Sequence, residues 1–265
     1  MLLEIKNLSI KLKKNNKIIV KNSSFSMKEN TSLGILGESG SGKSMTCKAI
    51  LNILDDRFEI KGEILFNGHN LLTLSDEQCR DIRGKEICMI LQNPMTSFDP
   101  LYTIENQMVE TFCQHLDISK KEALNIAIEA LEKMKLKDIR QVLKKYPHEL
   151  SGGMLQRIMI AIAIALKPKL IIADEPTTAI DSLNQKDIIE EFKILKNEMN
   201  VSLLFITHDL GVLSNLADNL IVMKDGEIVE KGNSENIISN PQHKHTKFLI
   251  DTRKTLMNRF KRVRI

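Results

Sequence analysis

One eight-residue stretch constrains the fold of this chain more than any other. Its residues are Gly37, Glu38, Ser39, Gly40, Ser41, Gly42, Lys43 and Ser44. They match G-x-x-x-x-G-K-[ST], the phosphate-binding loop that joins a strand to a helix. The preceding residues 32–36 are an apolar run typical of a buried strand, and residues 45–54 are apolar at helical spacing. The sequence therefore predicts a strand, a phosphate-binding loop and a helix, rather than a simple Gly/Ser turn.

Each residue type in this loop suits a bound polyphosphate. Glycines let the main chain curl until several N–H groups point at one anion. A helix that begins near Gly42 adds the positive end of its dipole. Lys43 supplies a mobile positive charge for the outer phosphates, and Ser44 supplies a hydroxyl for a magnesium ion.

The composition sets limits on function. The chain has 265 residues, 42% of them hydrophobic and 27% charged, as in ordinary globular proteins. A net charge of +4 is too small to indicate nucleic acid as a partner. The longest apolar run, residues 158–166, is far shorter than the ~20 residues of a membrane helix, and the N-terminus shows no signal-peptide core. Any membrane role should therefore come through a partner.

The hydrophobic pattern changes along the chain. Residues 3–10 alternate apolar and polar side chains, and residues 18–27 and 60–66 predict further strands of an antiparallel sheet. Later apolar runs at residues 87–91, 169–173 and 201–207 alternate with helical patterns. This order predicts an α/β fold, in which a mostly parallel core carries an N-terminal antiparallel β-subdomain.

Between residues 103 and 145 apolar side chains recur at helical spacing, separated by Lys and Glu. We expect an inserted α-helical subdomain at residues 93–155. The α/β core would then comprise residues 1–92 and 156–240, followed by a helical tail at residues 241–265.

A second group of candidate residues lies where predicted strands end. The run at residues 170–173 is followed by Asp174 and Glu175, and ligands of α/β sheets bind at the carboxyl ends of strands. Asp174 is the natural ligand for the magnesium ion that Ser44 also contacts, and Glu175 would orient or polarise the attacking water. The alternative is an acidic strand end that caps the next helix.

Gln92 and His208 also follow predicted strands. Alone, His208 would more often be an ordinary surface or core histidine, and Gln92 would carry no signal. Beside a phosphate loop and an acidic strand end, we expect His208 to contact the terminal phosphate. We expect Gln92 to reach the metal or the attacking water.

A second Gly-rich turn, formed by Ser151, Gly152 and Gly153, opens a predicted helix. It predicts a second anion site at a helix N-terminus. Because one phosphate loop is already present, this second site indicates that two chains share nucleotides across an interface.

Together these residues resemble the nucleotide-binding subunits of ABC transporters over nearly the whole chain. The matching motifs are Gly37–Ser44 (Walker A), Gln92 (Q-loop), residues 150–153 (signature), residues 170–175 (Walker B), residues 179–181 with Asp181 (D-loop) and His208 (switch histidine).

The resemblance implies a P-loop NTPase core of the ABC type that binds ATP with Mg²⁺ and hydrolyses it. In that family two cassettes pair head to tail, so Ser151 and Gly153 would serve the partner's nucleotide. The implied partners are a second ABC ATPase, homologous or identical, two transmembrane permease subunits and an extracytoplasmic solute-binding protein, without nucleic acid. The implied location is the cytoplasmic face of the cell membrane.

Finer matches indicate a branch of the family. Residues 83–87, 92–100 and 146–149 resemble the peptide/nickel importer ATPases, and residues 153–157 with 173–179 look closest to the first ATPase of nickel or metal-chelate importers. We therefore expect import of nickel or a metal chelate, with a dipeptide or oligopeptide importer as the alternative. A non-transport ABC ATPase is a further alternative, although the roughly one hundred residues between the Walker A and signature motifs are too few for the long coiled-coil insertion of the DNA-repair type.

The chain departs from the family in one respect. The family usually stacks an aromatic side chain on adenine, yet residues 13–20 contain none, which predicts weak base selectivity. In the C-terminal part, His243 and His245 follow Pro241, but two histidines do not complete a metal site.

Overall fold

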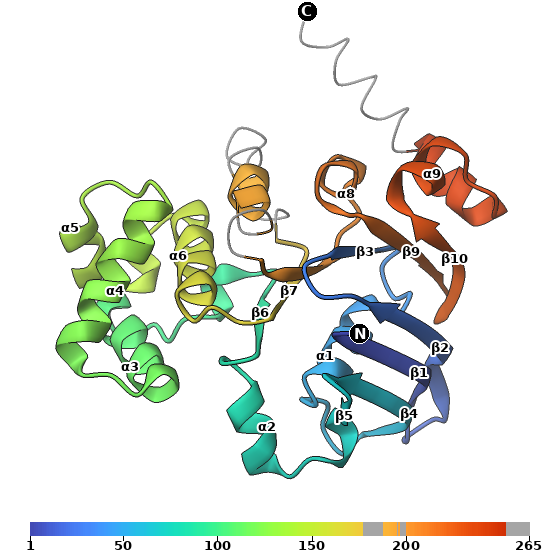
Figure 1. Ribbon diagram of the computed structural model, residues 1–265, viewed down its shortest axis with the longest axis horizontal. Helices are drawn as coiled ribbons and strands as arrows, with labels where there is room; N and C mark the ends of the chain where they lie inside the picture. Colours follow the sequence, from blue (N-terminus) through green and yellow to red (C-terminus); the bar gives the residue numbers. More distant parts are fainter. Residues whose placement is uncertain (177–187, 195, 197–199, 253–265) are drawn as a thin grey trace, which may run out of the picture. The chain divides into compact units, whose positions relative to one another are not determined.

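The computed structural model describes residues 1–176, 188–194, 196 and 200–252. The chain forms two units, the first made of Met1–Cys79 with Ser202–Ile265 and the second of Arg80–Val201 (Figure 1). The predicted helical subdomain at residues 93–155 and tail at residues 241–265 stay predictions, and residues 253–265 of that tail lie outside the described residues.

An antiparallel sheet forms the N-terminal part of the first unit. Its strands, in the order β2-β1-β4-β5, are β2 (Lys17–Met27), β1 (Leu3–Leu12), β4 (Phe58–Phe66) and β5 (His69–Asn70). The alternation of buried and exposed side chains along β1 is interrupted at Asn7. There the register with β2 and β4 shifts, and Asn7 has φ 53°. This bulge lets both Ile5 and Leu8 be buried although they lie three positions apart.

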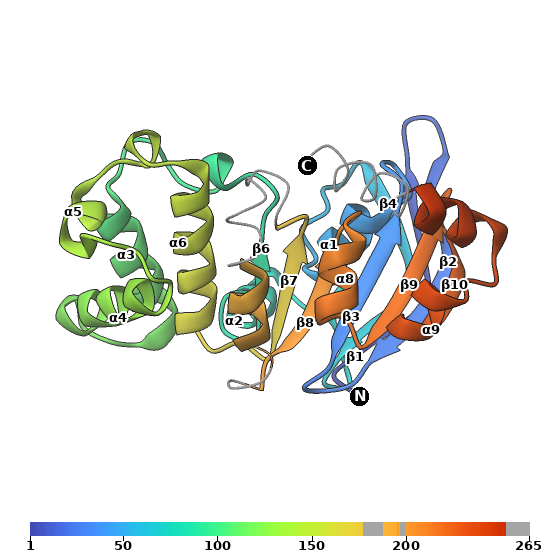
Figure 2. The ribbon, with the colours of Figure 1, turned by 90° about the horizontal axis from the view of Figure 1, so that it is seen from above.

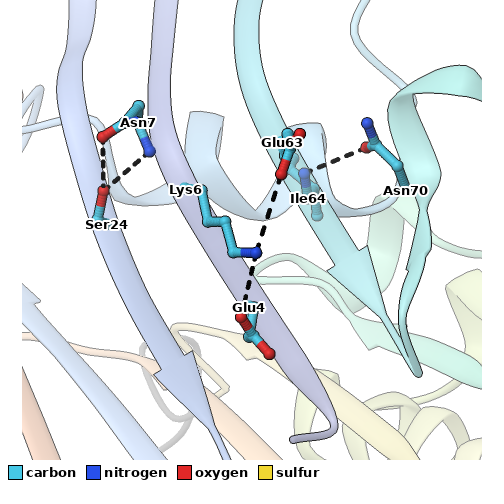
Figure 3. Close-up of polar contacts among 7 residues, drawn as sticks. All are labelled: Glu4, Lys6, Asn7, Ser24, Glu63, Ile64 and Asn70. Atoms are coloured by element: carbon cyan, nitrogen blue, oxygen red, sulfur yellow. Dashed lines mark hydrogen bonds and ion pairs between the residues drawn. The ribbon is translucent and has the colours of Figure 1, made fainter.

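Polar contacts bridge the strands around this bulge (Figure 3). The Asn7 N–H donates to the hydroxyl of Ser24 at 2.8 Å. Lys6 Nζ lies 3.6 Å from a carboxylate oxygen of Glu4 and 4.0 Å from one of Glu63. Because these ion pairs are solvent-exposed, they add little stability; the hydrogen bond satisfies the main chain where the ladder is interrupted.

A second, mixed sheet lies in the first unit. In spatial order, the strands of this sheet that belong to the first unit are β10 (Glu227–Asn233), β9 (Asn219–Lys224), β3 (Ser32–Gly37) and β8 (Ser202–Ile206). β3 runs parallel to β8 and β9, whereas β10 is antiparallel to β9. Every residue of β3 and β8 is buried, as expected for parallel strands with both faces covered.

Helices cover this sheet. They are α1 (Lys43–Ile50), α8 (Leu210–Leu216), α9 (Ser234–Ser239) and the helical residues 244–252. Figure 2 shows α8 and α9 beside β3 and β9. One hydrophobic cluster joins α8, α9 and helical residues 244–252 to the sheet, because Leu36 and Val222 pack with Leu213, Ile237 and Ile250. α1 is shorter than the sequence predicted and ends at Ile50, since Asn52 adopts a left-handed φ of 51°.

The second unit contains a parallel strand pair and a group of helices. The strands are β6 (Ile87–Ile90) and β7 (Leu170–Asp174). The helices are α3 (Ile104–Leu116), α4 (Lys120–Lys133), α5 (Ile139–Lys144), α6 (Gly152–Ala165) and the helical residues 188–194. Ser119 and Glu122 form a capping box that fixes the start of α4.

Four short elements complete the described chain. They are η1 (Leu71–Thr73), α2 (Asp76–Ile82), η2 (Pro94–Thr96) and η3 (Pro147–Glu149). Within the described ranges, no helix is both long enough and apolar enough to cross a membrane.

Candidate functional site

The phosphate loop has a shape that its glycines make possible. Gly40 and Gly42 adopt φ values of 80° and 101°, which favour glycine. A Cβ on Gly42 would lie 2.9 Å from the carbonyl oxygen of Ile19, and one on Gly37 would lie 2.5 Å from that of Met223. The chain's own packing therefore requires glycine at positions 37 and 42.

The side chain of Lys43 turns back into the loop. Its ammonium donates to the carbonyl oxygens of Gly37 and Glu38, at 2.9 and 2.8 Å, and lies 3.5 Å from the hydroxyl of Ser41. Lys43 is only 6% exposed. Its positive charge is thus fixed at the centre of the loop and at the start of α1, where a phosphate group would also meet the helix dipole.

The outer residues of the loop face solvent. Glu38, Ser39 and Gly40 are exposed, whereas Ser41 is buried and Ser44 is half-buried in the first turn of α1. The loop thus combines an accessible rim with a buried cation.

Sheet register places His208 beside this loop. Ile206 of β8 pairs with Ile35 of β3 in parallel register. Gly37 and His208 each follow two residues later, so the loop and His208 leave the same edge of the sheet. His208 is half-buried, and Asp209 caps α8 directly after it.

Gln92 and Glu175 meet in the second unit. Ile90 of β6 pairs with Ala173 of β7, which sets Gln92 opposite Glu175 two residues further on. The Gln92 side-chain amide donates to a carboxylate oxygen of Glu175 at 3.0 Å. Asp174 is 8% exposed, and Glu175 has a left-handed φ of 47°. Such strain in a non-glycine residue often marks a functional position.

Sequence reasoning placed Gln92 and Glu175 at separate strand ends and did not predict that they bind each other. The parallel pairing of residues 87–90 with 170–173 is the signal that could have revealed it, because one register determines every later pair.

The second Gly-rich turn has a different geometry. Ser151 is the N-cap of α6, and its hydroxyl accepts the N–H of Met154 at 3.3 Å. Gly152 and Gly153 are helical. A Cβ on Gly153 would meet no atom of the described chain within 4 Å. An exposed helix N-terminus is thus available to an anion.

The predicted site residues divide between the two units. The phosphate loop and His208 belong to the first unit, and Gln92, Ser151–Gly153, Asp174 and Glu175 belong to the second. Asp181 lies outside the described residues. In the part of the chain that the structure describes, no group of three or more His, Cys, Asp or Glu side chains could hold a metal ion.

Comparison with known proteins decides the family. The family model described as ABC transporter matches residues 20–178, more than half of the chain. The chain belongs to the ABC transporter family. This membership confirms the resemblance read from the sequence, and this cassette is accordingly a transporter ATPase that binds and hydrolyses ATP.

The chain is similar to ATP-binding proteins of import and transport systems. The metal-staphylopine import system ATP-binding protein CntD of Staphylococcus aureus is 46% identical over 224 residues, which cover 84% of this chain and 83% of that protein. The oligopeptide transport ATP-binding protein OppD of Bacillus subtilis is 44% identical, covering 82% of this chain and 61% of that protein. The dipeptide transport ATP-binding protein DppD of Lactococcus lactis is 45% identical, with 82% and 63% covered.

Solved structures confirm the predicted α/β fold of the ABC type. An ATP-binding cassette solved as a dimer in a post-hydrolysis state, bound to ADP and Pi, superposes with a TM-score of 0.78 at 29% identity, covering 88% of this chain and 98% of that one. A cassette from the cbiONQ transporter complex of Clostridium perfringens gives a TM-score of 0.75 at 23% identity, covering 90% and 91% of the two chains. The second likeness concerns the fold alone.

Proposed function

We propose that this cassette powers the import of nickel or a metal chelate across a membrane. The observation that carries the substrate class is the 46% identity to a metal-staphylopine import ATPase over 83% of that protein's length. The peptide-transport relatives, at 44% and 45% identity, are almost as similar. A dipeptide or oligopeptide importer is therefore the second candidate.

For the hydrolytic step, the hydrogen bond between Gln92 and Glu175 supports a specific division of roles. Glu175 is the group that orients and polarises the attacking water, and Gln92 holds its carboxylate in place. His208, at the edge of the sheet that carries the phosphate loop, contacts the terminal phosphate. Lys43 and the main-chain N–H groups of the loop bind the β- and γ-phosphates.

The donor set fits a magnesium ion. Ser44, Gln92 and Asp174 offer hydroxyl, amide and carboxylate oxygens, the hard ligands that Mg²⁺ prefers. Because Gln92 uses its amide nitrogen to bind Glu175, its amide oxygen is the atom left for the metal. When bound, the ion would neutralise charge that develops on the transferred phosphoryl group.

The signature turn supports a shared site. The open surroundings of Gly153 and the exposed helix N-terminus at Ser151 suit a phosphate that arrives from outside this chain. We propose that Ser151, Gly152, Gly153 and Asp181 act on the nucleotide of a second ABC ATPase subunit, homologous or identical. Loss of the γ-phosphate then removes the ligand that holds the pair closed.

Transport requires partners in the membrane, and we place this cassette on its cytoplasmic face. We propose that two permease subunits dock on residues 92–103, where Met95, Leu101 and Tyr102 are exposed by 46%, 78% and 53%. An extracytoplasmic solute-binding protein would complete the system. Cysteines introduced at Leu101 and in a cytoplasmic permease loop should crosslink, and the absence of a crosslink in every nucleotide state would exclude this docking segment.

The catalytic proposal is tested by Glu175→Gln. The change keeps the shape of the side chain but removes the charge that polarises water. Turnover should fall by about 100-fold or more, while ATP affinity stays near that of the unaltered protein and closed dimers accumulate in size-exclusion chromatography. Normal turnover in this variant would exclude Glu175 from the role.

The substrate proposal needs the complete transporter. The cassette and its permease and binding-protein partners should take up a labelled nickel chelate, and excess dipeptide should not compete. Competition by dipeptide would favour the second candidate without affecting the assignment as an ATPase.

A further inference from the structure

Two exposed rings lie just before the signature turn. The phenol ring of Tyr146 and the imidazole ring of His148 are stacked, with ring centroids 5.7 Å apart and an angle of 16° between their planes. Tyr146 is 41% exposed, and His148 is exposed as well. Because stacking on His148 uses one face of the phenol ring, the exposed part of Tyr146 can take a further flat group.

Hydrogen bonds of the main chain hold these rings on a rigid support, the short helix η3. The carboxylate of Glu149 accepts the N–H of Tyr146 at 2.8 Å. In return, the N–H of Glu149 donates to the carbonyl oxygen of Tyr146 at 3.0 Å. The N–H of Leu150 donates to the carbonyl oxygen of Pro147 at 3.1 Å, and Pro147 is buried. Because the support is fixed, a group that stacks on Tyr146 loses little free energy to ordering of the protein.

The rings are close to the signature turn along the chain. Ser151, the N-cap of α6, follows His148 by three residues, which span at most roughly 11 Å. That span is within the length of an extended nucleoside triphosphate. A nucleotide whose terminal phosphate meets the N-terminus of α6 would therefore have its base within reach of the stacked rings.

Tyr146 is one of three exposed Phe and Tyr side chains among the described residues, and the other two are Tyr102 and Phe248. Tyr102 lies in the proposed docking segment, and Phe248 lies on helical residues 244–252 of the first unit. Of the three, only Tyr146 is within five residues of a turn that we expect to bind phosphate. Nucleotide bases stack on aromatic side chains whatever the identity of the base.

We infer that Tyr146 binds the base of the nucleotide that the signature turn shares with the second ATPase subunit, with His148 stacked against the other face of its ring. This inference rests on the proposed shared site. This chain then holds the partner's nucleotide at two ends, at a phosphate by Ser151–Gly153 and at the base by Tyr146. Because stacking does not depend on the identity of the base, the ring tightens the binding of ATP and GTP alike. Such binding agrees with the weak base selectivity that the sequence predicts.

Ribose 5′-triphosphate separates the base from the phosphates, because it carries the same triphosphate without a base. The full chain is assayed in the ATPase pair with its second subunit. The readouts are kcat and KM for the hydrolysis of ATP, GTP and ribose 5′-triphosphate. Titration calorimetry on the single subunit gives the ATP affinity of its own phosphate loop, which does not involve Tyr146.

Tyr146→Leu keeps an apolar side chain but removes the ring. It should raise the KM for ATP and for GTP about tenfold, a factor typical of one stacked base, and change the KM for ribose 5′-triphosphate less than about twofold. The kcat of the pair and the ATP affinity of the single subunit should stay within about twofold. Tyr146→Phe should keep the KM of the unaltered pair. His148→Leu should raise the KM for ATP about threefold, because the ring of Tyr146 loses its support.

Phe248→Leu is the matched control, because it removes an exposed ring that adjoins no nucleotide motif, and it should leave all three KM values unchanged. If Tyr146→Leu raised the KM for ribose 5′-triphosphate as much as that for ATP, the variant would distort the turn and the inference would be overturned. An unchanged KM for ATP would overturn it as well. Both results leave the shared site standing. If the unaltered subunits formed no dimer with ATP in size-exclusion chromatography, the shared site would fail and the inference with it.

Discussion

The two Gly-rich turns of this chain look alike in sequence and differ in structure. In the phosphate loop, positive φ values and close contacts to Ile19 and Met223 make glycine necessary for the fold. In the signature turn, Gly153 is helical and a side chain there would meet open space within the described chain. The first turn is thus shaped by its own chain, whereas the second leaves room for a ligand or partner from outside.

The largest expected effect is a loss of ATP affinity when the ammonium of Lys43 is removed from the phosphate loop. Lys43→Ala removes the ammonium that lies at the centre of the loop, and with it charge-assisted bonds to the nucleotide. ATP affinity should fall ~100-fold or more, since such bonds contribute about 3 kcal/mol. Titration calorimetry measures the loss, with the exposed Lys144→Ala as control. Tight ATP binding by Lys43→Ala would show that Lys43 does not bind the phosphates of ATP.

Gly42→Ala should destabilise the protein itself. Alanine must adopt a φ near 101° and approach the carbonyl oxygen of Ile19, which together should lower the free energy of unfolding by about 2 kcal/mol. Urea unfolding without nucleotide measures this change. An unchanged urea midpoint would mean that the fold does not require glycine in the phosphate loop, and the two turns would not differ in this respect.

Gly153→Ala should leave the stability of the protein unchanged but lower its ATPase activity. The free energy of unfolding should stay within ~0.5 kcal/mol of the unaltered value or rise slightly, because alanine favours a helix over glycine. ATPase turnover should nevertheless drop about tenfold, a barrier increase of ~1.4 kcal/mol, because the new methyl group blocks the partner's nucleotide. Normal turnover would contradict a role for this turn in a shared site.

The smallest expected effect is a change in the free energy of unfolding with pH. Burial is the main cause that lowers the pKa of both His115 and His245 below the ordinary value of 6.5. The unfolded chain therefore binds more protons than the folded one once the pH falls below about 6.5, and stability decreases on the acid side of that value. Above it, these histidines contribute no pH dependence.

Urea unfolding at pH 7.5 and 5.5 measures this decrease. His245→Gln should show a smaller loss between the two values than the unaltered protein. An equal loss in His245→Gln would mean that His245 does not titrate differently in the two states.

The sequence identified most of the candidate site because its motifs are local. Strand, loop and helix around residues 37–44 follow from neighbouring residues, and the acidic pair at 174–175 comes directly after an apolar run. The sequence did not predict the short helices α2, α8 and α9. Each has only six or seven residues, which are too few to show the helical period of apolar side chains.

The sequence by itself determined the fold class and the family, because their motifs lie in contiguous stretches of the chain. The same stretches predict the residues that bind phosphate. Only the tertiary structure decided which distant residues meet. Gln92 binds Glu175 across 83 positions of the chain, and Ile250 of helical residues 244–252 packs with Leu36 of β3. Such pairs depend on strand register and helix packing, which hydrophobic periodicity does not encode. In the same way, only packing shows that the glycines of the first turn serve the fold, while Gly153 of the second is free of that demand.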